Sequence, residues 1–284
     1  MKGEELKMKK YELIKESETC SKRRIMYRIR ALKDFSDIKA GDVGGWVCSY
    51  GNLSQDGDCW IYDDAKCLDD ARVYDNAKMY DNAIMYDNSR MSGNAIMFGN
   101  AKMYDNAMMY DNAMMYDNAK MYNNTEMYDH ARMFNNTIMG DNSRMFNSSR
   151  IFNNAKMYDN AMMYDNAIIG DNAKMFDNSR MYDNAIMYDN AILNKDKLLY
   201  GSINKSYKKI FQYHCEKRLI TAILTEENEI LYSIGCQIGI TKEKFIDRIY
   251  NDCKIKGKGL EEYPHRQEYL DIIDMAENYL RKFI

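Results

Sequence analysis

Three histidines and seven cysteines are the side chains of this 284-residue chain that could carry nucleophilic, acid–base or zinc chemistry. His214 and His265 occur in the same region as Cys215, Cys236 and Cys253, but their wide spacings lack the close pairs that zinc sites show. The chain has no Walker loop, dinucleotide fingerprint or nucleophile elbow. We therefore expect no metal site and no cofactor, and cysteines that are reduced thiols.

A repeat of six residues dominates the composition, which includes 24 Met, 24 Tyr and one Pro. From Ile61 to Met187 every sixth residue is apolar, over 22 hexads without an insertion. The position four residues later is always small, with Ala in 16 hexads and Ser or Thr in six. Tyr, Asp and Asn usually fill the positions between. A strict short period of this kind predicts a repeat architecture.

The period decides between helix and strand. Six residues turn an α-helix by about 600°, so the apolar residues would form no stripe, whereas in extended chain the apolar and small positions share one side. Three short strands joined by Asp-Asn corners then close a coil, with Asn suited to the left-handed backbone of a corner. This spacing is typical of left-handed parallel β-helices, and the hexads predict about seven coils. A disordered Asn-rich tract is the alternative.

The flanks predict caps for the exposed strand edges of this mainly-β fold. We assign residues 1–60 to an N-terminal cap with a strand at 27–32 and a turn at 41–47, residues 61–198 to the β-helix, and residues 199–284 to an α/β domain. That domain should contain strands at 218–224 and 229–235, and a helix at 241–252. A final helix follows Pro264, with an apolar stripe formed by Leu270, Ile273, Ala276, Tyr279, Leu280 and Phe283.

Several segments are similar to known proteins. Residues 27–32, 39–47, 52–54 and 59–65 resemble the start of hexapeptide-repeat proteins carried by phages and prophages, and residues 234–239 resemble their tails. The resemblance implies a phage-derived cytoplasmic protein and brings no settled activity or site residues. The N-terminus has no apolar signal region, and no uninterrupted apolar stretch is long enough to span a membrane.

Acyl transfer must be weighed, because many left-handed hexapeptide helices are acyltransferases. Those enzymes resemble one another in placing a catalytic histidine near a loop extruded from the coils, with the acyl donor lying along the helix. His130 is the histidine of the repeat, at a corner position, and no loop interrupts the hexads. Since a general base needs a positioned partner and a pocket, we interpret His130 as a tolerated corner residue.

The repeat surface offers two kinds of rows. An aromatic residue follows the apolar one in 18 hexads, and the resulting ladders serve either binding or mutual stacking; one ladder comprises Tyr80, Phe98, Tyr116, Phe134 and Phe152. Corner carboxylates form acidic rows, which are either solvated corners or an imitation of the phosphates of a nucleic acid. One such row comprises Asp69, Asp87, Asp105, Asp141, Asp159 and Asp177. The candidate binding residues are Asp141, Asp159, Asp177, Tyr104, Tyr122 and Tyr158.

These observations together predict a non-enzymatic interaction protein of the cytoplasm. We expect it to form a homo-oligomer and to bind a host protein, and the sharper hypothesis is inhibition of a host defence nuclease or another nucleic-acid-acting enzyme. A net charge of −3 argues against direct binding to nucleic acid or to a membrane surface. The alternatives are a structural or oligomerisation rod and a degenerate hexapeptide acyltransferase.

Overall fold

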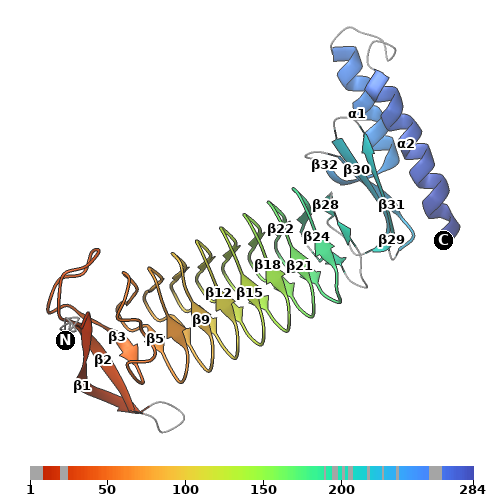
Figure 1. Ribbon diagram of the computed structural model, residues 1–284. Coiled ribbons are helices and arrows are strands. Elements are labelled where there is room, and N and C mark those ends of the chain that lie inside the picture. Colours follow the sequence, from red (N-terminus) through yellow and green to blue (C-terminus); the bar gives the residue numbers. More distant parts are fainter. Residues whose placement is uncertain are drawn as a thin grey trace, which may run out of the picture.

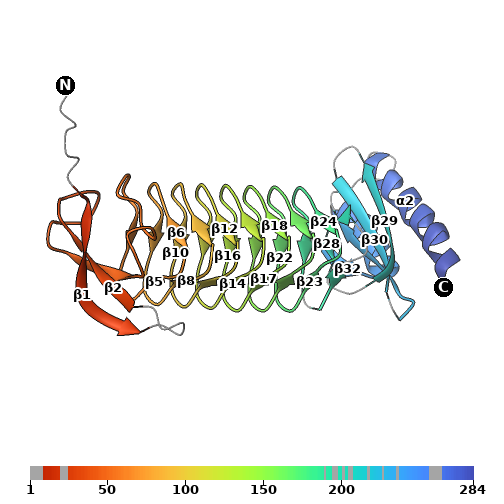
Figure 2. The same ribbon diagram turned by 60° about the horizontal axis from the view of Figure 1, so that its bottom comes forward.

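The computed structural model describes residues 9–19, 25–188, 190–193, 198–199, 202–203, 207–215, 218–225, 227–234, 237–255 and 264–284. A long parallel β-helix, here called the shaft, carries an antiparallel N-terminal sheet at one end and a small sheet with two helices at the other (Figure 1). The shaft has about eight turns, so the predicted mainly-β solenoid fold is confirmed. Figure 2 shows its coils stacked in register along one axis.

Each coil gives one two-residue strand to each of three parallel sheets. The first sheet begins with the antiparallel strands β1 and β2 and continues in parallel, and it comprises β1 (Tyr11–Thr19), β2 (Ile25–Ala31), β3 (Val43–Val47), β5 (Lys66–Cys67), β8 (Ile84–Met85), β11 (Lys102–Met103), β14 (Lys120–Met121), β17 (Ile138–Met139), β20 (Lys156–Met157), β23 (Lys174–Met175) and β26 (Ile192–Leu193).

The other two sheets contain parallel strands alone. The second comprises β6 (Arg72–Val73), β9 (Arg90–Met91), β12 (Met108–Met109), β15 (Glu126–Met127), β18 (Arg144–Met145), β21 (Met162–Met163), β24 (Arg180–Met181) and β27 (Leu198–Leu199). The third comprises β4 (Trp60–Ile61), β7 (Lys78–Met79), β10 (Ile96–Met97), β13 (Met114–Met115), β16 (Arg132–Met133), β19 (Arg150–Ile151), β22 (Ile168–Ile169), β25 (Ile186–Met187) and β28 (Ser202–Ile203).

The interior of the shaft is filled by the apolar and small positions of the hexads. Met97 and Ala101, like their equivalents in other coils, are 0% exposed, because the two positions share the inward side of an extended chain. Three serines at the small position, Ser89, Ser143 and Ser179, donate their hydroxyl to a carbonyl three residues earlier, as Ser143 does to Gly140 at 2.8 Å. The buried hydroxyls of Thr125, Thr137 and Ser149 have no hydrogen-bond partner.

Each described corner of the hexads closes through a left-handed residue at the Asp position, as at Asp81 and Asp105 with φ of 57°. Gly93 and Gly99 occupy the same position at 67° and 69°, which fits a conformation that Gly, Asp and Asn tolerate best. At one corner the next residue, Asn178, also has a positive φ. The sequence had favoured the Asn of each corner for this role. The structure shifts it to the preceding residue and leaves that Asn exposed, where its amide joins the next coil.

The N-terminal end of the shaft is covered by hydrogen-bond donors. The carbonyl of a small inward position accepts an N–H from the coil before it, as the Ala95 carbonyl accepts that of Lys78 at 2.9 Å. The equivalent carbonyl of the first coil, that of Cys59, has no preceding coil. Lys10 Nζ donates to the Cys59 carbonyl at 3.0 Å. The Tyr11 hydroxyl donates to the Leu53 carbonyl at 2.7 Å. These side chains therefore replace the missing coil.

The C-terminal end is covered by an antiparallel sheet of β29 (Tyr207–Cys215), β30 (Arg218–Thr225), β31 (Ile230–Ile234) and β32 (Gln237–Ile240). Tyr207, Ile223 and Leu231 join the core of the shaft. The opposite face, including Ile220 and Tyr232, packs on two helices. These helices are α1 (Lys242–Ile255) and α2 (Pro264–Leu280), and the short 3-10 helix η2 (Arg281–Phe283) follows α2.

The predicted elements of this domain are largely confirmed. Strands at 218–224 and 229–235 correspond to β30 and β31, and both helices form. The apolar stripe predicted for the final helix is confirmed at Ile273, Ala276 and Leu280, which are buried. The prediction is wrong for Phe283, which is 44% exposed. Strand β29 had not been predicted, since its alternation is broken by consecutive polar residues.

In the described part of the chain, neither helix has the length and apolar character needed to cross a membrane.

Candidate functional site

The three edges of the shaft differ in the side chains that they present. The edge between the first and second sheets, here called the acidic edge, carries Asp69, Asp87, Asp105, Asn123, Asp141, Asp159 and Asp177. The edge between the third and first sheets carries a groove, here called the amide groove, lined by Asp117, Asn118, Asn135, Asn136, Asn153, Asn154, Asp171 and Asn172. All six predicted binding residues lie along the acidic edge.

Corner carboxylates are tied to the backbone of the next coil. Asp81 Oδ2 accepts the Gly99 N–H at 3.0 Å, and on the acidic edge Asp105 Oδ2 accepts the Asn123 N–H at 3.0 Å. A carboxylate that accepts an N–H is stabilised, which offsets the repulsion along such a row. These carboxylates therefore join successive coils in addition to giving the edge its charge.

Three predicted aspartates form one row on the acidic edge. Asp141, Asp159 and Asp177 follow one another in consecutive coils, and Asp159 is exposed whereas the other two are half-buried. Asn123 Nδ2 donates to Asp141 Oδ1 at 2.8 Å. The structure thus places these three side chains together as predicted, and it leaves their role in binding a prediction.

The three predicted tyrosines stand beside that row and interact with other rings. Tyr104 stacks on Tyr86 with ring centroids 5.3 Å apart and an interplanar angle of 3°. Tyr122 leans over Gly140, where its ring occupies the space that a Cβ would take. Tyr122 and Tyr158 interact across this gap. Burial, with Tyr158 next in effect, raises the pKa of Tyr122 to about 12.

The other aromatic ladders are stacked as well. Phe98 and Tyr116 lie 4.8 Å apart with an interplanar angle of 2°, and Phe152 reaches Tyr188 at 6.0 Å across Gly170. The rings of the ladders are half-buried and not fully exposed. Mutual stacking, one of the two predicted roles, is therefore confirmed, and the free aromatic area is smaller than the sequence indicated.

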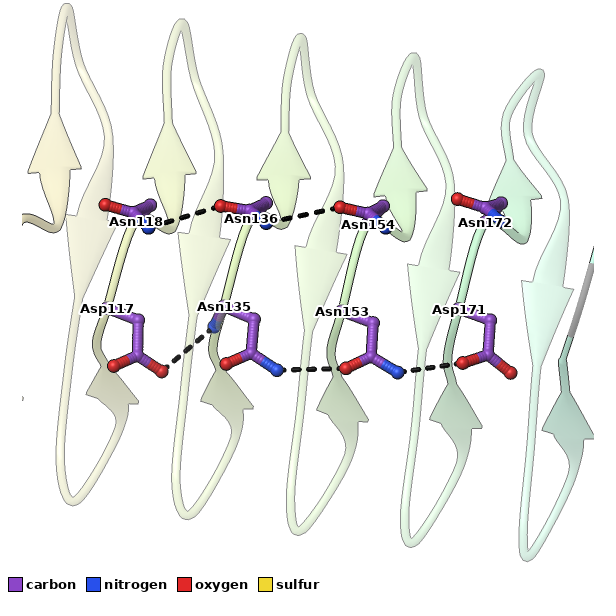
Figure 3. Close-up of a pocket in the computed structure, with 8 residues that line it drawn as sticks. All are labelled: Asp117, Asn118, Asn135, Asn136, Asn153, Asn154, Asp171 and Asn172. Carbon is purple, nitrogen blue, oxygen red and sulfur yellow. Dashed lines mark hydrogen bonds between the residues drawn. The ribbon is translucent and has the colours of Figure 1, made fainter.

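The amide groove consists of two parallel rows that Figure 3 shows side by side. In one row, Asn118 Nδ2 donates to Asn136 Oδ1 at 3.2 Å, and Asn136 Nδ2 donates to Asn154 Oδ1 at 3.3 Å. In the other, Asn135 Nδ2 donates to Asn153 Oδ1 at 2.9 Å, and Asn153 Nδ2 donates to an Asp171 oxygen at 2.8 Å. The groove encloses about 450 Å³.

A second hollow of about 550 Å³ continues the amide groove onto the first sheet. It shares Asn136, Asn154 and Asn172 with the groove, and it adds Lys156 and Lys174 between two isoleucines, Ile138 and Ile192. Each amide in a ladder keeps one N–H and one lone pair for a ligand. The combined surface therefore offers amide donors and acceptors, ammonium groups and apolar contacts in one line.

Sequence reasoning missed this groove because it followed the aromatic and Asp positions. The signal is visible when the outward position is taken every third hexad. Along the first sheet that position holds only Lys and Ile, at Lys66, Ile84, Lys102, Lys120, Ile138, Lys156, Lys174 and Ile192. Sorting the outward residues by sheet would have distinguished this stripe of Lys and Ile from the outward Arg, Met and Glu residues of the second sheet.

The histidine of the repeat lies away from the groove. His130 is exposed at a corner between the second and third sheets, and its N–H donates to the Asn147 carbonyl at 2.9 Å. The side chains of His214, Cys215, Cys236, Cys253 and His265, weighed above as zinc ligands, lie outside the described residues. Among the side chains that the structure describes, no three of the His, Cys, Asp or Glu type converge as metal ligands do.

Comparison with known proteins gives one partial similarity. No family model matches the chain. The uncharacterized acetyltransferase YdcK of Escherichia coli (strain K12) is 41% identical over 63 residues, which are 20% of this chain and 19% of that protein. The chain therefore spans about a fifth of that relative's length. The present chain is thus a β-solenoid protein with partial similarity to a hexapeptide acetyltransferase.

Proposed function

We propose that the shaft is a degenerate hexapeptide acyltransferase whose amide groove holds a coenzyme A-type acyl donor. The observation that carries the proposal is the line formed by the Asn ladder, Lys156 and Lys174, and the isoleucines beside them. Such a donor has amides along its pantetheine arm, phosphates at one end and apolar segments between. The amides of the donor would hydrogen-bond to the Asn row, and its phosphates would lie against the ammonium groups of Lys156 and Lys174. The partial similarity to an acetyltransferase supports the same class.

The proposal includes binding of the donor without transfer of its acyl group. A general base must lie within hydrogen-bond reach of the proton that it abstracts. His130 stands at a different edge of the shaft from the groove. The two carboxylates of the groove, Asp117 and Asp171, lie at the ends of its row, where each accepts a hydrogen bond, from the Asn135 N–H and from Asn153 Nδ2. The chain would then use the acyl donor as a ligand and not as a substrate.

Calorimetric titration of the full chain with acetyl-coenzyme A tests this proposal. Binding should weaken about tenfold when Lys156 and Lys174 are both replaced by Ala, since each solvent-accessible ion pair contributes up to about 1 kcal/mol and about 1.4 kcal/mol corresponds to a factor of ten in affinity. Lys120→Ala, on the same sheet outside the hollow, is the matched control. Release of free thiol from the donor should not exceed that of buffer. No heat of binding would refute the proposal, and rapid thiol release would show that the groove is catalytic.

A second candidate, a non-enzymatic interaction protein, rests on the acidic edge. Asp141, Asp159 and Asp177 present carboxylates in consecutive coils. A basic surface on a host protein would complement them, and the phage-type resemblance favours a defence nuclease or another nucleic-acid-acting enzyme as that partner. Association driven by such charges should weaken with salt, because the screening length is about 8 Å at physiological ionic strength.

Two sets of variants distinguish charge from aromatic contact at this edge. Replacing Asp141, Asp159 and Asp177 by Asn keeps a residue that the same corner already holds at Asn123, so the fold should persist while association with a captured nuclease slows. Replacing Tyr104, Tyr122 and Tyr158 by Ser removes the rings, and another hexad already holds serine at this position, at Ser92. Normal binding by the Asp variants would reject the phosphate-mimic hypothesis. Sedimentation of the same proteins tests the predicted homo-oligomer.

A further inference from the structure

A lysine and a cysteine are held against each other at the N-terminal end of the shaft. Lys10 is 1% exposed and Cys59 is 0% exposed. The Lys10 Nζ lies 3.3 Å from the Cys59 Sγ and donates to the Cys59 carbonyl at 3.0 Å. The same Nζ also donates to the Gly57 carbonyl at 3.2 Å. An amine and a thiol are therefore in contact in a place from which bulk water is excluded.

Burial pushes both groups toward their uncharged forms. It lowers the pKa of Lys10, which favours the free amine, and it raises the pKa of Cys59, which favours the thiol. A free amine has a lone pair that an ammonium lacks. Burial thus favours the form of Lys10 whose nitrogen can be oxidised. The contact with Lys10 acts the other way on the pKa of Cys59 and lowers it, which favours the thiolate, the form of sulfur that is oxidised.

We propose that Lys10 and Cys59 are a modification site, at which dioxygen converts the amine and the thiol into a covalent nitrogen–oxygen–sulfur bridge. One oxygen atom becomes bonded to Nζ and to Sγ, so an N–O and an S–O bond form while one N–H, the S–H and the O–O bond break. The second oxygen leaves as water with the two hydrogens. Nitrogen and sulfur together lose four electrons, and dioxygen gains four.

The pair differs from the other described cysteines in its neighbour. Cys67 is equally buried, but its Sγ donates to the Asn52 carbonyl at 3.6 Å. Cys48 is half-buried. The bridge would join residues 10 and 59 and so tie the segment that begins β1 to the first coil. Oxidation would then lock the cap through the contact that already covers the carbonyls of the shaft.

Mass spectrometry of the full-length folded protein tests the bridge. After exposure to air-saturated buffer, the intact mass should rise by one oxygen atom less two hydrogen atoms, and a phosphine reductant should reverse the change. Digestion should give one joined peptide that contains both Lys10 and Cys59. Protein kept without oxygen under the same reductant should give the two peptides separately.

Cys59→Ser is the matched variant, because serine stands at the same inward position in Ser89 and Ser143 and should fold normally. It should lose the mass change completely, whereas Cys67→Ser should keep it. Oxygen added to Cys59 alone, as a sulfenic or sulfinic acid without the joined peptide, would overturn the proposal. An unchanged mass of the folded wild type after exposure to oxygen would overturn it too.

Discussion

At its N-terminal end the shaft is closed by hydrogen-bond donors beside apolar residues such as Ile29, whereas at its C-terminal end it is closed by an apolar sheet face. Lys10 and Tyr11 donate to carbonyls of the first coil. At the other end Ile223 and Leu231 extend the core of Met and Ala beyond the last coil. Between the two, every coil covers the next with the same backbone bonds.

The direction of the backbone hydrogen bonds accounts for the polar end. Carbonyls at the small and apolar inward positions accept N–H groups from the coil before them, so in the first coil these carbonyls have no backbone donor. A buried carbonyl without a partner costs free energy, so this end needs donors. The two caps therefore meet different needs: the N-terminal cap supplies hydrogen-bond donors and the C-terminal cap supplies apolar surface. Substitutions at each end can test this difference.

The largest effect is expected from Lys10→Met, which keeps the length of the side chain and removes its N–H groups. The carbonyls of Gly57 and Cys59 lose their donor. At roughly 1–3 kcal/mol for each orphaned group, reduced by water entry at the end of the shaft, unfolding should become easier by about 4 kcal/mol. Denaturant titration measures this. Lys9→Ala, at an exposed position, should be nearly neutral, and equal losses would refute the donor cap.

At the apolar end, Ile223→Ala should lower the free energy of unfolding by about 3 kcal/mol, because it leaves a cavity between the sheet and the shaft. Ile223 is 3% exposed. Hydrogen exchange should show the loss concentrated in the last coils and in β30. The control is Tyr213→Ala, since Tyr213 is 38% exposed. A similar change in both variants would mean that the sheet does not seal the shaft.

Within the shaft, Ala113→Leu should cost about 2 kcal/mol by overpacking an interior that is already filled. Ala113 is 0% exposed. Lys120→Leu places the same side chain at an exposed outward position and should be nearly neutral. Thermal melting of the two variants measures the difference, and equal melting temperatures would contradict the inward–outward assignment.

The smallest expected effect is a gain. Thr137→Ala removes a buried hydroxyl without a hydrogen-bond partner and installs the residue that most coils carry there, so stability should rise by about 1 kcal/mol. Ser143→Ala is the contrast, because the Ser143 hydroxyl donates to the Gly140 carbonyl at 2.8 Å and its removal should give no gain. A loss of stability in Thr137→Ala would show that the methyl of Thr137 fills space that Ala leaves empty.

The sequence alone determined the parallel β-helix, its inward positions and the alignment of Asp141, Asp159 and Asp177. Those features follow from the period, because a strict repeat of six permits one extended arrangement in which apolar and small residues share a side. It also placed β30, β31, α1 and α2, whose turns and caps are local.

Only the tertiary structure decided which surfaces are free and how the ends are closed. Stacking half-buries the aromatic rings, so the ladder predicted as a docking surface is largely occupied by itself. The amide groove combines residues from successive coils and from two rows, and the Lys10–Cys59 contact joins positions 49 residues apart. The repeat pattern gives the residue type at each position of a hexad. It does not show which side chains lie next to one another in neighbouring coils or at the ends of the shaft.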